Sequence, residues 1–225
     1  MTGADSRDAS LSRLNDAATA LQLPLPEREA LRLLDFVALL RRWNSTYNLT
    51  AVRDPDEMLV QHLFDCLAVV PPFQRALAGA ASEPRVLDVG SGGGLPGIVL
   101  AMLLPGVRVV CVDTVGKKAA FIRQAAVELR LPNLQAEHSR VESLRAEPFD
   151  LITSRAFASL ADFARLTQRH LATSGIWAAM KGKRPDRDVA ELTPDIEVFH
   201  VEPLHVPELD AERCLIWMRR RPPPA

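Results

Sequence analysis

The chain has 225 residues, of which 48% are hydrophobic and 24% are charged. This composition is typical of a globular protein with one substantial core, and it excludes fibrous and disordered chains. The formal net charge is -1, so any binding of nucleic acid needs a local basic patch rather than attraction to the whole molecule.

Membrane, export and metal signals are missing from the sequence. It has no apolar run of about 18 residues, and its first residues lack the basic and then apolar order of a secretory signal. Cys66, Cys111 and Cys214 stand singly in apolar stretches, without the paired spacing of a zinc site. We therefore expect a cytoplasmic protein that binds no metal and does not contact a membrane.

Helical patterns dominate residues 1–80. One apolar stripe at helical spacing predicts a helix from Pro26 to about Trp43, ended by the polar stretch NSTYN. Asp54 and Pro55 supply an N-cap and a first helical residue for a second helix, which Pro71 and the following proline are expected to stop. We expect residues 1–80 to form a helical extension packed on the core, and we leave the role of residues 1–20 open.

Short β-rich runs alternate with helical patterns from residue 84 onward. Helices are expected near residues 96–104, 116–129, 159–170 and 185–191. Strands are expected near residues 85–89, 108–113, 134–138, 149–154, 175–180, 196–202 and 213–219. Such alternation predicts an α/β domain, residues 81–225, with a mainly parallel sheet covered on both faces. The last two strands are too close in sequence for a helical crossover, so they should pair antiparallel at one edge.

The stretch DVGSGGGLPG, residues 88–97, follows the first predicted strand and precedes a predicted helix. Ligands of open parallel sheets bind beyond the carboxyl ends of the strands, and glycines allow the backbone to approach them closely. Residues 92–97 satisfy the dinucleotide pattern G-x-G-x-x-G. The frame Asp88-x-Gly90-x-Gly92-x-Gly94 is similar instead to motif I of the class I S-adenosylmethionine (SAM) methyltransferases.

Chemistry favours SAM over a dinucleotide. SAM has no phosphate and carries a sulfonium, so a carboxylate near the loop is useful rather than repulsive. Asp113 ends the second strand and is placed to accept hydrogen bonds from ribose hydroxyls, although dinucleotide folds place an acid similarly. No His or Cys is placed for hydride transfer, and a nicotinamide oxidoreductase remains the weaker alternative.

The end of the fourth strand, Ser154-Arg155-Ala156-Phe157, has neither an acid nor a thiol. The methyl acceptor should therefore need no deprotonation and no covalent activation, and N7 of guanine fits this description. Basic residues follow three neighbouring strands and point to a phosphate-bearing partner: Arg140, Arg155, Lys181, Lys183 and Arg184. Phe157 is either a stacking partner for an unstacked base or a core residue.

Several stretches together resemble the RsmG (GidB) family, whose members methylate N7 of guanosine 527 in bacterial 16S ribosomal RNA. They are WNSTYNLTAVRDPDEMLVQHLFDCL, VLDVGSGGGLPGI, HSRVES, FDLITSRAFASL and MKGK. The resemblance runs from about Arg42 to the last strand, with motif order and spacing kept. It implies a Rossmann-like class I SAM-methyltransferase fold with seven strands, the last one antiparallel, behind an N-terminal helical cap.

The resemblance also assigns residues. It implies SAM contacts at Gly90, Leu95, Val141, Glu142 and Arg155. It further implies RNA contacts at Arg140 and Lys181, and 16S rRNA in the small ribosomal subunit or its precursor as the partner. Gly93 departs from the family, which often has proline there.

In-line transfer to N7 needs alignment but no general base. His62 and Asp65, three residues apart on the second helix, are then expected to join the cap to the core rather than to act as a catalytic pair. A SAM-binding ribosome assembly factor without catalysis is the other alternative, and a monomer is the default state.

Overall fold

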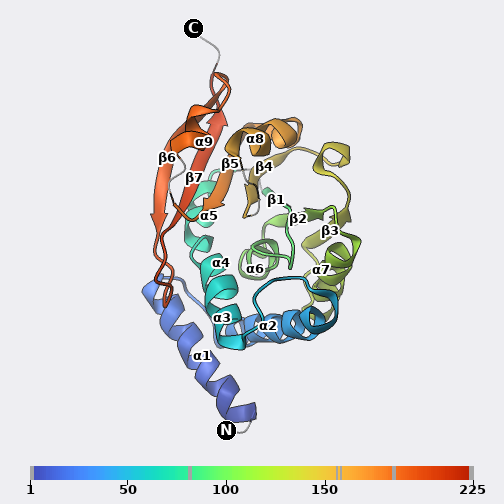
Figure 1. Cartoon of the computed structure of the whole chain (residues 1–225), viewed down its shortest axis with the longest axis vertical. Helices are drawn as coiled ribbons and strands as arrows, with labels where there is room; N and C mark the ends of the chain where they lie inside the picture. The colour runs from blue at the N-terminus through green and yellow to red at the C-terminus, as the bar shows by residue number, and fades with distance from the viewer. Residues whose placement is uncertain (1–2, 81–82, 156, 158, 184–185, 223–225) are drawn as a thin grey trace.

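The computed structural model describes residues 3–80, 83–155, 157, 159–183 and 186–222. Within these residues, seven strands form one sheet in the order β3-β2-β1-β4-β5-β7-β6 (Figure 1). The strands are β1 (Arg85–Val89), β2 (Arg108–Asp113), β3 (Leu134–His138), β4 (Phe149–Ser154), β5 (Leu171–Lys181), β6 (Ile196–Leu204) and β7 (Arg213–Arg220). β7 lies antiparallel between β5 and β6, and β1 to β5 pair in parallel. The expected mainly parallel sheet with an antiparallel last strand is confirmed.

Helices connect these strands and precede the sheet. Between strands lie α6 (Gly97–Leu103), α7 (Gly116–Glu128), α8 (Leu160–Thr167), α9 (Asp186–Ala190) and the 3-10 turns η2 (Val141–Ser143) and η3 (Gln168–His170). The segment before β1 contains α1 (Gly3–Ala20), α2 (Glu27–Tyr47), α3 (Pro55–Met58), the π-helical η1 (Leu59–Phe64), α4 (Asp65–Leu67) and α5 (Val70–Leu77). We call α1 to α5 the helical cap.

The sheet separates two apolar cores, because successive side chains of a strand point to opposite faces. Leu87 and Val110 belong to a buried cluster that includes side chains of α8. Val86 and Val109 face the other way, into a cluster that includes side chains of α6, α7 and the helical cap. The cap therefore shares its core with one face of the sheet.

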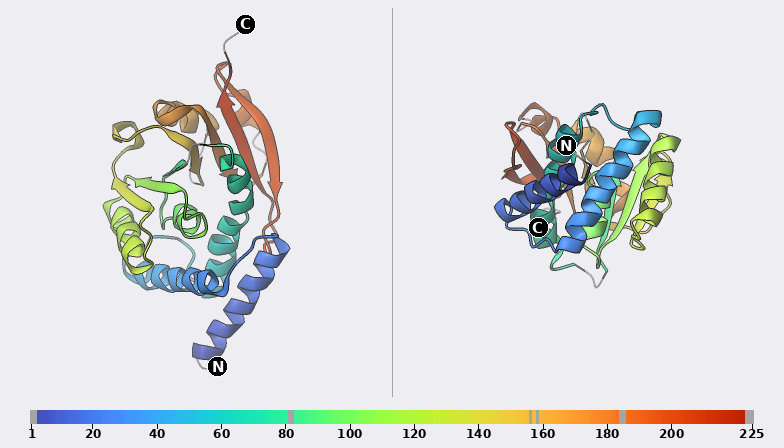
Figure 2. Two further views of the ribbon diagram at one scale, coloured as in Figure 1. Left: turned by 180° about the vertical axis from the view of Figure 1, so that it is seen from behind. Right: turned by 90° about the horizontal axis from the view of Figure 1, so that it is seen from below.

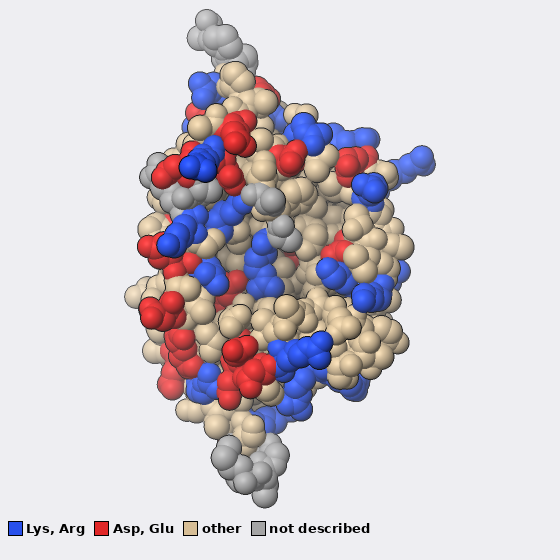
Figure 3. Space-filling model, in the orientation of Figure 1, with Lys and Arg blue, Asp and Glu red and all other residues tan. Residues whose placement is uncertain are grey.

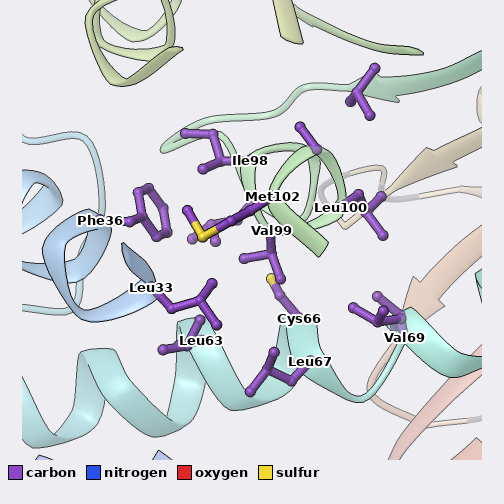
Figure 4. Close-up of a cluster of buried hydrophobic side chains, with 14 of the residues drawn as sticks. Leu33, Phe36, Leu63, Cys66, Leu67, Val69, Ile98, Val99, Leu100 and Met102 are labelled. Carbon is purple, nitrogen blue, oxygen red and sulfur yellow. The ribbon is translucent and has the colours of Figure 1, made fainter. Parts of the chain in front are cut away.

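Side chains from three helices meet in the larger core (Figure 4). Leu33 and Phe36 of α2, Leu63 of η1, and Ile98 and Val99 of α6 are each fully buried there. Full burial of a large apolar side chain stabilises the fold by about 1.5–3 kcal/mol. This contact fixes the cap over α6, the helix that follows the glycine loop. The domain boundary near residue 80 stays a prediction, since one cluster runs through both sides of it.

Helix α1 lies along the outer side of the cap, and Figure 2 shows its N-terminal end directed away from the sheet. Leu14 is fully buried in the larger core. Arg13 donates to Glu208 at 2.6 Å and to Asp56 at 2.6 Å, and so ties α1 to the β6–β7 connection and to α3. Residues 1–20, which the sequence left without a role, thus include a helix that packs on the fold.

Two helix ends differ from the sequence predictions. The NSTYN stretch does not end α2 at Trp43, because the helix continues to Tyr47 and stops at Asn48, whose left-handed φ of 48° closes it. Pro71 and the following proline do not simply stop a helix. They occupy the first turn of α5, where a missing N–H costs nothing and the fixed φ of proline suits the helix.

Among the described residues, no helix is long and apolar enough to cross a membrane. The same part of the chain holds no cluster of three or more His, Cys, Asp or Glu side chains suited to a metal ion. The three cysteines are buried.

Replacing Leu63 with alanine tests the contact between cap and sheet. We expect Leu63→Ala to lower the free energy of unfolding by about 3 kcal/mol, because it removes a buried side chain and leaves a cavity. Val127→Ala on α7 is the control, since Val127 is 75% exposed and its change should stay within about 0.5 kcal/mol. Urea unfolding followed by circular dichroism measures both, and equal effects would contradict the shared core.

Candidate active site

The glycine loop leaves β1 and turns sharply into α6. Its backbone has positive φ at Gly90, Gly92 and Gly94, with values of 69°, 57° and 77°. At Gly94, a Cβ atom would lie 2.3 Å from the Cδ1 atom of Ile98. A larger residue there is excluded by both the backbone conformation and the packing of α6. Gly92 and Gly94 therefore shape the loop without contributing a side chain.

Asp88 supports the loop from beneath. It is fully buried, and its Oδ2 atom accepts a hydrogen bond of 2.9 Å from the backbone N–H of Gly97 at the start of α6. A Cβ at Gly97 would lie 2.3 Å from the Sγ atom of Cys111, so only glycine permits this approach. Burial raises the pKa of Asp88 to about 6. The carboxylate predicted to contact a cofactor thus lies on the core side of the loop.

Asp113 holds the loop from the side. Its Oδ2 atom accepts from the N–H of Gly92 at 2.9 Å, and its Oδ1 atom accepts from the N–H of Val115 at 2.8 Å. Lys118 on α7 lies 3.9 Å from the same carboxylate. One acidic side chain at the end of β2 therefore fixes both the loop after β1 and the turn before α7.

A cavity of about 430 Å³ opens beside Asp113, at the carboxyl ends of β1 and β2. A cavity of this size falls in the usual range for small-molecule sites. It brings together six of the residues predicted from the sequence: Gly90, Asp113, Arg140, Val141, Glu142 and Phe157. We call it the loop cavity.

The lining of the loop cavity fits a nucleoside with an amino acid end. Val141 and Phe157 supply apolar walls, and Asp113 supplies acceptors at its rim. Ser139 also lines the cavity, and among the described residues its buried Oγ atom has no hydrogen-bond partner. A buried hydroxyl without a partner is costly, and a ligand atom would satisfy it. The residues present therefore fit SAM.

Leu95 and Arg155 are not part of this lining. Leu95 is 3% exposed and packs in the larger core. Arg155 lines a second cavity of about 380 Å³. This cavity is enclosed by the cap, the ends of β4 and β5, and the start of β7. Other residues of this second cavity include His62, Asp65, Lys181 and Arg213. We call it the basic cavity.

Two contacts show that the cavities are neighbours. Ser154, just before Arg155, donates its hydroxyl to the carbonyl of Val89, which lines the loop cavity. Lys181 of the basic cavity donates to the carbonyl of Phe157, a lining residue of the loop cavity, at 2.9 Å. Figure 3 shows a hollow near the centre of this face, with lysine and arginine side chains at its rim.

The structure brings together only some of the basic residues that were predicted to face a phosphate-bearing partner. Arg140 and Lys183 are exposed, and Arg184 lies outside the described residues. Lys181 is partly buried, and its ammonium group also lies 3.3 Å from the carboxylate of Asp188. Phe157 packs on Phe163, with ring centroids 5.3 Å apart, while it also lines the loop cavity. The contact with Phe163 is that of a core residue, and stacking of Phe157 on a base stays a prediction.

His62 is buried at the back of the basic cavity. Its Nε2 atom lies 2.7 Å from the hydroxyl of Thr50. Burial and the positive charge of Arg155 lower the pKa of His62 to about 4. The imidazole is therefore neutral at physiological pH and is held by a contact within the cap.

Several lining residues were given no role from the sequence. Lys118 stands in the first turn of α7, and Ser139 directly follows β3, inside the HSRVES stretch. Arg213 begins β7, far along the chain from the other basic residues. Position next to a strand end was the available signal for Ser139 and Arg213, but many surface residues share it.

Solved structures support the fold. TrmN from Thermus thermophilus aligns with a TM-score of 0.54 over 72% of this chain and 53% of that chain, at 20% identity. A coclaurine N-methyltransferase bound to N-methylheliamine and SAH aligns with a TM-score of 0.53 over 91% of this chain and 75% of that one, at 12% identity. Identities this low show the architecture alone, which is that of class I SAM methyltransferases.

Sequence relatives show the family as well as the fold. The family model GidB, rRNA small subunit methyltransferase G, matches residues 29–216. The ribosomal RNA small subunit methyltransferase G of Paracidovorax citrulli is 56% identical over 95% of this chain and 91% of its own length. The protein of the same name from Leptothrix cholodnii is 58% identical over 91% of this chain and 93% of its own length. This chain belongs to the GidB family of rRNA small subunit methyltransferases G.

Proposed function

We propose that the protein transfers the methyl group of SAM to N7 of guanosine 527 in 16S ribosomal RNA, without a general base. The observation that carries the proposal is the loop cavity, with Asp113 at its rim and the basic cavity beside it. Family membership supports ribosomal RNA of the small subunit as the substrate. We further propose that the protein acts in the cytoplasm as a monomer, on the small subunit or its precursor.

SAM, when bound, supplies an electrophilic methyl group on its sulfonium. We place the ribose at Asp113, the adenine region at Val141 and Glu142, and the methionine end at the loop beginning with Gly90. Arg155 is then the positioning residue between cofactor and RNA. Because the chain holds these groups in a fixed arrangement, alignment can supply an effective molarity on the order of 10⁵ to 10⁸ M.

A nicotinamide dinucleotide fits the loop less well. Dinucleotide sites set a pyrophosphate against the free N–H groups at a helix N-terminus. Here the N–H of Gly97 already donates to the carboxylate of Asp88. That buried acid occupies the donor, and above its pKa of about 6 its charge repels a phosphate. The contact therefore favours SAM.

The end of β4 offers no base for the acceptor. The hydroxyl of Ser154 is buried and donates to a backbone carbonyl. Asp65 reaches this point from the cap, in line with its expected role of joining the cap to the core, and each of its oxygens accepts a hydrogen bond from an arginine. These contacts suit an acceptor such as N7, whose lone pair needs no deprotonation.

Transfer of labelled methyl from SAM to 30S subunits tests the proposal directly. The subunits should come from a strain that lacks the endogenous modification, and the labelled base should be mapped afterwards. We expect label on N7 of a single guanine in 16S RNA. Binding of SAM without label on mature subunits or on assembly precursors would favour the alternative, an assembly factor without catalysis.

The role of Asp113 is tested by cofactor binding. We expect Asp113→Ala to weaken binding of SAM about 10- to 100-fold, because the glycine loop and the turn before α7 each lose a hydrogen bond to a charged acceptor and the ribose loses its partner. Glu137→Gln on β3 is the control, since that acid is exposed and lines neither cavity. Isothermal titration calorimetry with SAM measures both, and unchanged affinity in Asp113→Ala would contradict the assignment.

His62 gives a prediction about pH. Its folded pKa of about 4 is lower than the unfolded value of about 6.5, so the unfolded chain binds more protons between these values. The stability of the wild type relative to His62→Gln should therefore fall as the pH drops from about 6.5 to about 4. Urea unfolding across this range measures the difference.

At pH 7 and above, His62→Gln should keep both SAM binding and methyl transfer, since N7 needs no base. A variant that binds SAM and is folded but transfers no methyl would show instead that the imidazole takes part in the reaction.

A further inference from the structure

Asp65 joins two arginines that are far apart in the sequence. Its Oδ2 atom accepts a hydrogen bond of 3.2 Å from Nη1 of Arg155, and its Oδ1 atom accepts one of 3.0 Å from Nε of Arg213. The Asp65 side chain is only 4% exposed. Arg155 follows β4, Arg213 begins β7 and Asp65 begins α4 of the cap, so three separate elements meet at this carboxylate.

Each arginine keeps donors beyond this shared contact. Arg155 uses Nη1 for Asp65 and for the carbonyl of Gln61, whereas Arg213 uses Nε for Asp65 and Nη1 for the carbonyl of Glu212. A guanidinium group has five N–H donors. The side chains of Arg155 and Arg213 are 28% and 27% exposed, and both line the basic cavity. Within the described residues, Nη2 of each arginine is left for a ligand.

The charges of this cavity favour an anion. Two guanidinium groups share the single carboxylate of Asp65, which leaves an excess of one positive charge. His62 is neutral above a pH of about 4, and Lys181 is paired with Asp188. Paired guanidinium groups bind phosphate oxygens with several directed hydrogen bonds, which suits a phosphodiester.

We propose that Asp65 is a positioning residue that holds Arg155 and Arg213 side by side, so that their remaining N–H groups grip a phosphate of the RNA substrate in the basic cavity. This inference rests on the proposed function, because it takes RNA as the ligand. It adds a carboxylate of the cap and an arginine of β7 to the RNA contacts that sequence resemblance implies. Since the basic cavity adjoins the loop cavity, the phosphate gripped there belongs to the region of the acceptor nucleotide.

The contacts of Asp65 give a physical reason for an acid in the basic cavity, where we propose that RNA binds. Without it, two guanidinium groups would repel each other in a partly buried space and would turn toward solvent. With it, both side chains are held in place before the RNA arrives. The contact also makes RNA binding depend on the cap, since Asp65 lies directly after the π-helical segment that packs on α6.

Binding of 30S subunits at several salt concentrations tests the proposal without requiring methyl transfer. S-adenosylhomocysteine should be present throughout, so that the cofactor state is fixed. We expect Arg213→Gln to weaken binding about 10-fold and to reduce the slope of log affinity against log salt by about 0.7–0.9, the value for one lost phosphate contact. The affinity for SAM should not change, since Arg213 does not line the loop cavity.

Asp65→Asn gives the sharper test, because two models predict opposite signs. Removal of an acid from a basic surface should strengthen RNA binding if only overall charge matters. A positioning role predicts weaker binding, again by about 10-fold, because the arginines lose their fixed arrangement. Asp162→Asn is the matched control: it breaks an exposed ion pair with Arg165 at 2.7 Å on α8 and should leave binding unchanged.

Tighter or unchanged binding by a folded Asp65→Asn variant would overturn the proposal. If circular dichroism shows that this variant does not fold, the test depends on Arg213→Gln. An unchanged salt slope in that variant would then overturn the proposal. In the double variant Asp65→Asn/Arg213→Gln, the loss should be smaller than the product of the two single losses, since both act on one site.

Methyl transfer by the wild type separates this inference from the proposed function. If the variants alter the salt slope but the wild type transfers no methyl group, the phosphate site is supported and the proposed catalytic function is contradicted. If the wild type transfers methyl and the slopes are unaltered in both variants, the proposed function is supported and the phosphate site is contradicted.

Discussion

Two buried carboxylates at the carboxyl ends of β1 and β2 hold the glycine loop in place, and the site depends on that constraint. Asp88 accepts from the first N–H of α6, and Asp113 accepts from the N–H groups of Gly92 and Val115. Backbone donors that would otherwise face a ligand phosphate are thereby satisfied by the protein itself. The loop becomes a rigid wall with an acidic rim, which suits a cationic cofactor better than a pyrophosphate. For the base-free transfer that we propose, which depends on alignment, a rigid wall is the main requirement.

The helical cap is the second determinant of the site. Its apolar side chains share one core with α6, so the cap sits over the helix that begins at the glycine loop. At the same place it delivers Asp65 and His62 to the ends of β4 and β5. His62 and Asp65 lie three residues apart in the chain, but His62 contacts Thr50 and Asp65 contacts two arginines. Asp65 thus fixes Arg155 and Arg213 at the ends of sheet strands, while Thr50 holds His62 within the cap.

Most of the fold could be predicted from sequence, because strands and helices have strong local periodicity. The strands after residue 84 were found near their true bounds, and the antiparallel last strand followed from the short connection before it. Predictions failed where one residue type serves two purposes. The NSTYN stretch does end α2, but only at its last residue, Asn48, and Pro71 lies in the first turn of a new helix. In both cases the residue type fits a helix end and a helix turn equally well, so the exact boundary was missed.

For the site, the sequence by itself determined the ligand class and the strand ends that supply the residues, because the glycine spacing, Asp113 and the motif after β3 each follow a strand. Family resemblance added the RNA and the position of the guanosine in it. The tertiary structure alone decided the direction in which each side chain points. Alternation along β1 turns Asp88 into the core, while Asp113 at the end of β2 reaches the loop cavity. Arg155 lies in a separate basic cavity because Asp65 and Arg213, distant in the chain, are brought beside it. Contacts between such distant residues arise from packing, and no local spacing in the sequence records them.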